Sequence, residues 1–208
     1  MKEPSDTEIF KRFLDWNPEV AGLPAAIEAI DRCEIAFAPF RFPTELRLLY
    51  TVFDGFEFEP GLGILSLAGV TEKRKYLQAL WKGEEQAFPP ALFPVADMDG
   101  SMWFTVLAKE HKPRAPILTL AMGDGSNELE LEYESLALMA ETILEQSRVT
   151  SVNQYPGTTG HYSDSEASAA VKPALNPNMY RIDQKGVFSS TGVQNLFDLD
   201  DLPDEWFE

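Results

Sequence analysis

Residues 42–55 constrain the fold of this chain more than any other stretch. Their apolar side chains recur at the spacing of one helical face, at Leu46, Leu49, Tyr50 and Phe53. Pro43 suits the first turn of a helix, where its missing N–H costs no hydrogen bond, and Gly55 suits a left-handed turn that ends one. The pattern predicts an amphipathic helix with one face buried in the core.

Asp54 does not fit this helix, because a carboxylate at the C-terminal end faces the negative end of the helix dipole. Two explanations are open. Asp54 caps the turn that follows, or a group outside the helix attracts its charge. The first is the ordinary explanation, since Asp-Gly pairs commonly form turns.

Further helices are expected on both sides of this stretch. Ser5-Asp6-Thr7-Glu8 has the pattern of a capping box, which predicts a helix to about Trp16. A second helix is expected to start near Leu23-Pro24, a third after Thr71 with its end at Gly83, and the last after Ser135. Lys73, Arg74 and Lys75 would lie in the first turn of the third helix, either as a solvated face or as an anion-binding spot.

Strand patterns occupy most of the remaining domain, with short turns between them. Strands are expected at residues 62–67, 102–107, 116–121 and 128–133, and near Val95. Because strands joined in sequence by tight turns form an antiparallel meander, the fold class is α+β. We predict an antiparallel meander sheet packed with about four to five helices over residues 1–148.

Residues 149–208 are predicted to be a less regular C-terminal extension. They begin with a polar linker and end in residues 196–208, where acids alternate with large apolar side chains. Such a tail either docks on its own domain or binds a partner. Docking is favoured because Leu196, Phe197, Trp206 and Phe207 would otherwise be exposed together.

The charge of the chain limits its partners. Its 208 residues include 34 acids and 17 bases, a formal net charge of −17. This charge argues against nucleic acid and anionic membrane surfaces, which would repel it, and favours a basic protein. No secretory leader pattern or bilayer-length apolar run is present in the sequence, so we expect a cytoplasmic protein of open oligomeric state.

The sequence offers no arrangement of catalytic or metal-binding residues. His111 and His161 are far in sequence from each other and from Cys33, the single cysteine. Two Asp-Gly segments, at residues 97–100 and 124–127, begin like calcium loops but lack the Glu at the twelfth position, so they are interpreted as hairpin turns. We therefore expect no cofactor, no metal and no enzymatic activity.

Two acidic segments are candidate contact surfaces. Alternation places one set of carboxylates on a single strand face, at Glu128, Glu130 and Glu132. Next-but-one residues lie about 7 Å apart, within the Debye length of about 8 Å, so these charges repel. A solvated outer face is the ordinary interpretation, and a binding surface for a basic partner is the functional one.

The second acidic segment directly follows the helix of residues 42–55. Its candidate contact residues are the acids Asp54, Glu57 and Glu59 and the aromatic anchors Phe56 and Phe58. An acidic rim around aromatic anchors is what recognition of a basic protein requires.

The pattern Phe42-Pro43-x-Glu45-Leu46-Arg47-x-Leu49-Tyr50-x-x-x-Asp54-Gly55 resembles the signature helix of the SUKH superfamily, in which a Pro-started helix ends in an Asn-Gly or Asp-Gly turn. Residues 63–67 and 93–100 resemble two strands of that family, and residues 123–125 a further turn. The resemblance covers roughly residues 23–145. It implies a binding module without a shared catalytic constellation, since known members are mostly bacterial toxin-immunity proteins and yeast regulators of cell-wall synthesis.

These observations together predict an immunity protein that neutralises a cognate polymorphic or contact-dependent toxin. The toxin would be basic, for example a nuclease, because a positive surface that holds phosphates attracts an acidic inhibitor. The alternative is a regulatory scaffold or adaptor of the cell-wall-regulator type that acts through its acidic tail.

Overall fold

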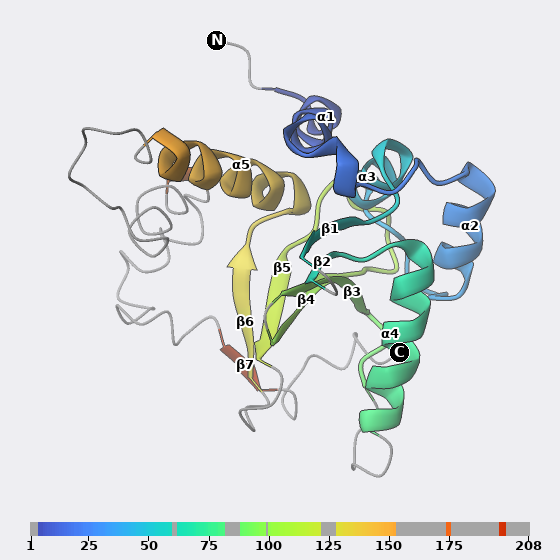
Figure 1. Cartoon of the computed structure of the whole chain (residues 1–208). Coiled ribbons are helices and arrows are strands. Elements are labelled where there is room, and N and C mark those ends of the chain that lie inside the picture. Colours follow the sequence, from blue (N-terminus) through green and yellow to red (C-terminus); the bar gives the residue numbers. More distant parts are fainter. Residues whose placement is uncertain are drawn as a thin grey trace.

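The computed structural model describes residues 4–59, 62–81, 88–98, 100–121, 128–152, 174–175 and 196–198. These ranges contain five named α-helices and one sheet, and in Figure 1 the helices lie above the sheet and to its right. The helices are α1 (Asp6–Trp16), α2 (Ile27–Ile35), α3 (Thr44–Val52), α4 (Leu67–Leu80) and α5 (Leu136–Val152), with a 3₁₀ turn, η1, at Pro18–Val20.

The sheet follows the order of the sequence. Its strands are β1 (Phe56–Glu59), β2 (Leu62–Ile64), β3 (Leu92–Met98), β4 (Ser101–Val106), β5 (Ile117–Ala121), β6 (Glu128–Tyr133) and β7 (Leu196–Asp198). Every neighbouring pair is antiparallel. The first six strands form the expected meander, so the predicted α+β class is confirmed.

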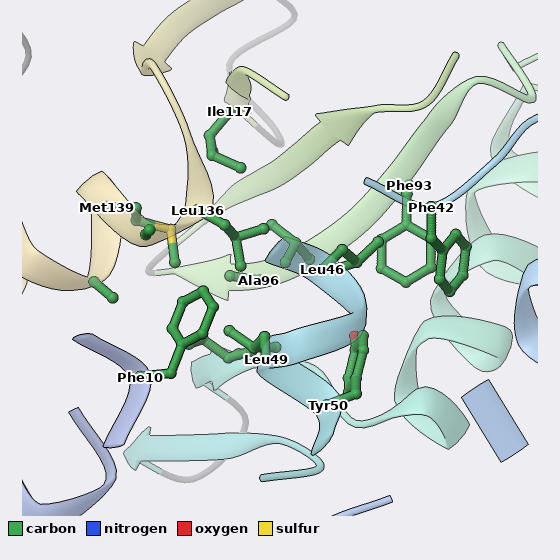
Figure 2. Close-up of a cluster of buried hydrophobic side chains, with 14 of the residues drawn as sticks. Phe10, Phe42, Leu46, Leu49, Tyr50, Phe93, Ala96, Ile117, Leu136 and Met139 are labelled. Carbon is green, nitrogen blue, oxygen red and sulfur yellow. The ribbon is translucent and has the colours of Figure 1, made fainter. Parts of the chain in front are cut away.

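Helix α3 lies at the centre of the core, as its periodicity predicts. Leu46, Leu49, Tyr50 and Phe53 are all fully buried. In Figure 2 the side chains of α3 lie between Phe10 of α1, Phe93 of β3 and the start of α5. Because each buried side chain of this size contributes about 1.5–3 kcal/mol, this one face anchors the fold.

The end of α3 differs from the expected glycine closure. The helix stops at Val52, and Phe53 is already extended, with φ −155°. Gly55 does have a positive φ of +91°, but it lies beyond that extended residue and turns the chain into β1. A Cβ at Gly55 would also lie 3.0 Å from the backbone nitrogen of Ser66, so the close approach of α4 adds a second reason for glycine here.

Helix α1 confirms the predicted capping box, whereas α2 starts later than predicted. The Ser5 hydroxyl accepts from the N–H of Glu8, and the Glu8 carboxylate accepts from the N–H of Ser5. Helix α2 begins at Ile27 because the preceding backbone is bonded elsewhere. Ala25 N–H donates to the Tyr50 carbonyl, and the Leu23 carbonyl accepts from Asp54 N–H.

The start of α4 corrects two predictions. Strand β2 ends at Ile64, and the helix begins at Leu67 with Ser66 as N-cap, its hydroxyl accepting from Gly69 N–H. Thr71 is therefore inside the helix, where its hydroxyl donates to the Leu67 carbonyl. The helix ends at Leu80, and the predicted end at Gly83 lies outside the described residues.

The basic cluster of α4 is neither solvated as a whole nor in the first turn. The Lys73 ammonium lies 2.6 Å from a carboxylate oxygen of Asp97 in β3. Arg74 donates to the Ala36 carbonyl, and its guanidinium lies 4.0 Å from the ring centroid of Phe37. Two of the three cations thus tie α4 to β3 and to the end of α2.

Strand β7 lies beside β6, at the edge of the meander. Its register places Asp198 opposite Glu128, Phe197 opposite Leu129 and Leu196 opposite Glu130. Helix α5 runs to Val152, four residues past the predicted domain boundary. The division into residues 1–148 and 149–208 otherwise stays a prediction, because nearly all of the extension lies outside the described residues.

Candidate functional site

A hollow of about 560 Å³ opens where α3, the β1–β2 hairpin and the start of α4 meet. It is lined by residues 19–22, 54–57 and 63–66 and by Gly69. Among these described lining residues three are acidic, Glu19, Asp54 and Glu57, and none is lysine or arginine. We call this hollow the acidic groove.

Asp54 joins two helices across this groove. One of its carboxylate oxygens accepts from the backbone N–H of Leu67, at 2.7 Å. Leu67 is the first residue of α4, where N–H groups lack partners within the helix and the dipole favours an anion. Of the two explanations for this charge, the structure supports the second: the group that attracts it lies outside α3.

The walls of the groove are main-chain segments that lie very close to one another. A Cβ at Gly22 would lie 2.1 Å from the carbonyl oxygen of Asp54, and one at Gly63 would lie 2.0 Å from that of Phe56. Gly22 N–H also donates to the Gly55 carbonyl, at 2.9 Å. Side chains at these glycines would force the walls apart, so the shape of the groove is fixed by the main chain.

Phe56 is not an exposed anchor, which corrects one predicted contact residue. It is only 2% exposed, and its ring centroid lies 4.8 Å from that of Phe13 and 5.7 Å from that of Phe53. Glu57, the next residue of β1, is exposed at the groove. Phe58 and Glu59 belong to β1, but their side chains lie outside the described part of the structure.

The second acidic segment lies on β6. Glu130 is exposed and Glu132 is half-buried, while Leu129 and Tyr133 are buried. The predicted alternation does not hold to the end of the strand, because β6 has a bulge where Leu131 pairs with Leu118 and Tyr133 with Ile117. Leu129 therefore packs in one core cluster and Tyr133 in the other. The side chain of Glu128 is not among the described ones. Strand β7 pairs with residues 128–130 of β6, so Glu130 lies within the sheet, whereas Glu132 lies beyond the end of β7.

The structure does not bring the two acidic segments together. Strands β1 and β6 are separated by four others in the sheet order. Five strand spacings of about 4.8 Å place them about 24 Å apart. A single partner would need a broad interface to contact both, and a small one would use either the acidic groove or the β6 face.

Glu45 is a buried carboxylate whose role the sequence did not reveal. It is completely buried in the first turn of α3, and its two oxygens accept from Ala115 N–H at 2.8 Å and Ala137 N–H at 3.1 Å. Burial raises the pKa of Glu45 to about 7, although the hydrogen bonds from Ala115, Ala137 and Leu136 oppose this shift. Glu45 thus caps the start of α5 from a distant helix.

The residues of potential chemical interest lie apart. His111 Nε2 lies 2.9 Å from the Thr44 hydroxyl, at the surface, and burial raises the pKa of the Cys33 thiol to about 11. The described residues contain no group of three or more His, Cys, Asp or Glu side chains that could hold a metal ion. None of their helices is long and apolar enough to cross a membrane.

Comparison with known proteins agrees with this architecture. Residues 24–141, more than half of the chain, match the model of the SMI1 / KNR4 family (SUKH-1). The match begins just before α2 and ends within α5, so it covers α3, the first six strands and the acidic groove except for residues 19–22. No curated protein sequence matches this chain.

Proposed function

The chain belongs to the SMI1 / KNR4 family (SUKH-1), and from that premise we propose that it is a non-enzymatic protein-binding module that neutralises a cognate toxin. In this proposal the toxin is a basic protein, for example a nuclease. The acidic groove is the main contact surface, and the β6 face with Glu130 and Glu132 is a second one that a large partner also reaches.

The acidic groove is the observation that carries this proposal. Glu19 and Glu57 are exposed at its rim, and Asp54 lies inside, while its backbone walls are held at fixed positions. A preformed hollow of one charge sign loses little conformational entropy when a lysine or arginine side chain enters. The net charge of −17 acts at longer range, because it accelerates the encounter with a basic partner.

The surroundings of the titratable groups support a binding role and not a catalytic one. Cys33, with its raised pKa, remains a thiol at neutral pH and is a weak nucleophile. Glu45, whose pKa would suit proton transfer, is enclosed by backbone donors and reaches no solvent. Neither group lines the acidic groove.

Binding kinetics with charge-reversal variants test the contact surface. The partner to be used is a toxin-like domain encoded in the reading frame next to this chain, once such a frame has been identified, and protection is scored as growth when both proteins are expressed together. Replacing Glu19 and Glu57 by lysine should lower the association rate constant about tenfold at low salt and flatten its salt dependence. Glu28→Lys combined with Glu110→Lys, at two exposed positions outside the acidic groove, changes the net charge by the same amount and is the matched control. Unchanged association kinetics in the groove variant would remove the groove from the interface.

The β6 face requires a separate comparison. Glu130→Gln combined with Glu132→Gln removes two charges without adding bulk. If this face belongs to the interface, the association rate falls and depends less on salt. If the rate stays the same as for the unmodified protein, this face is solvated only, which is its ordinary interpretation.

The alternative function is an adaptor that acts through its acidic tail, and the alternation of acids with large apolar side chains in residues 196–208 is the feature that favours it. Ending the chain after Val152, where α5 ends, separates the two functions. A toxin-binding domain should keep its affinity, whereas a tail-dependent adaptor should lose its partner. Circular dichroism of the shortened chain must first show that the helices remain.

A further inference from the structure

A second, larger hollow lies apart from the acidic groove and shares no lining residue with it. Its volume is about 680 Å³, and it extends from Phe40 across residues 106–110 to Leu118 of β5 and Leu131 of β6. Phe40, Leu107 and Leu118 form a buried apolar floor. Lys109, Lys112 and Arg114 lie around it, and we call this hollow the basic groove.

The charge of this rim contrasts with the rest of the molecule. Three of the 17 bases of the chain line one hollow, together with a single acid, Glu110. Lys109 is exposed, and Lys112 lies 3.4 Å from Glu110 with both side chains largely in solvent, so that ion pair is weak. Arg114 pairs with Asp6 of α1. A ligand for this groove needs negative charge and apolar side chains.

The chain itself contains such a ligand. Residues 199–208, which lie outside the described part, read Leu-Asp-Asp-Leu-Pro-Asp-Glu-Trp-Phe-Glu and contain five acids and no base. Four large apolar side chains alternate with these acids, at Leu199, Leu202, Trp206 and Phe207. We propose that residues 199–208 bind in the basic groove of the same chain, with their apolar side chains on its floor and their carboxylates at its lysines.

Strand β7 places the start of this segment near the groove. Asp198 lies opposite Glu128, and Leu131, which lines the groove, is three residues further along β6, or about 10 Å. Leu118 is one strand beyond, so crossing from β7 to β5 adds about 10 Å more. Strand β7 runs away from the groove, so the chain must first reverse its direction. A turn uses about four residues, and the remaining six span at most about 20 Å, which covers this path.

The occupant is the same chain and not a second copy, because β7 already holds the segment within reach. A tethered ligand has a high effective concentration at its site, and a second molecule would have to compete with it. This inference does not depend on the proposed toxin binding, since the acidic groove and the basic groove share no lining residue.

Fluorine NMR of the full chain labelled with 5-fluorotryptophan tests the proposal. The chain has four tryptophans, and comparison with a Trp206→Phe variant identifies the Trp206 signal. We expect this signal to be displaced from its position in urea, to remain displaced on dilution, and to move towards the urea position as salt is added. A Trp206 signal already at the urea position in buffer overturns the proposal. A displacement that disappears on dilution also overturns it, because the occupant would then be a second copy.

Charge reversal in the full chain identifies the groove. Lys109→Glu combined with Lys112→Glu should abolish the displacement of Trp206, whereas Lys75→Glu, at an exposed position on α4, should leave it unchanged. Both groove lysines are exposed, so their replacement leaves the core intact. Adding Asp200→Lys and Asp201→Lys to the variant with Lys109→Glu and Lys112→Glu should restore the displacement of the Trp206 signal. If Trp206 keeps its displaced signal in that variant, it binds elsewhere and the proposal is wrong.

Discussion

The buried carboxylate of Glu45 predicts a pH dependence of stability whose sign can be worked out. Two effects oppose each other at this residue. Burial disfavours the charged form, and backbone N–H groups that point at both oxygens favour it. Burial is the larger effect, so the folded pKa lies near 7, above the ordinary value of 4.5.

A group with a raised folded pKa binds its proton more tightly in the folded state. The extra stability is therefore fully present below about pH 4.5 and is lost as the pH rises through about 7. An increase of the pKa from 4.5 to about 7 corresponds to about 3 kcal/mol in the free energy of unfolding. Glu45→Gln has nearly the same shape but does not titrate, so it is the reference from which this effect is measured.

The assay is urea unfolding of both proteins, followed by tryptophan fluorescence over this pH range. The stability of the unmodified protein minus that of Glu45→Gln should fall by about 3 kcal/mol from about pH 4.5 to above pH 7. Glu28→Gln, an exposed change on α2, should show no such trend. A difference that rises with pH would refute the reasoning, because the backbone donors would then outweigh burial.

Three further substitutions test the groove and the core, each by urea unfolding. Gly22→Ala should destabilise the fold by about 1–3 kcal/mol, because its Cβ would lie 2.1 Å from a carbonyl oxygen, whereas Gly69→Ala, with its nearest contact at 3.4 Å, should be tolerated far better. Asp54→Ala should cost about 1 kcal/mol through the lost cap of α4, and equal stability would contradict that role. Leu49→Ala should cost about 2–5 kcal/mol, and Leu80→Ala, half exposed, much less.

The core helix and the meander were predictable because their signals are local. Apolar spacing in residues 42–55 identifies the buried face of α3, and turns between successive strands determine their antiparallel order. The start of α4 was not predictable in the same way. Ser66 and Thr71 are both suitable N-caps, and Asp54, twelve residues before Ser66, bonds at the earlier start.

For the candidate contact residues, prediction from the sequence was limited in a different way. Side chains alternate along β1, so Phe56 and Glu57 lie on opposite faces and could not both belong to one exposed patch. Phe56 faces the core and is buried, whereas Glu57 is exposed. Glu45, in the first turn of α3, also suits the dipole of its own helix, so its position alone indicates no other role. Its bonds to Ala115 and Ala137 connect residues that are 70 and 92 positions away, and no local pattern predicts them.

In the acidic groove, the residues that determine the shape differ from those that carry the charge. Gly22 and Gly63 fix where the walls lie, whereas Glu19 and Glu57 supply the negative charge at the rim. The charge of the rim and the position of the walls are therefore set by different residues. In the proposed role, a change of partner charge would be met by substitutions at these two rim positions, while the glycines keep the main-chain walls in place.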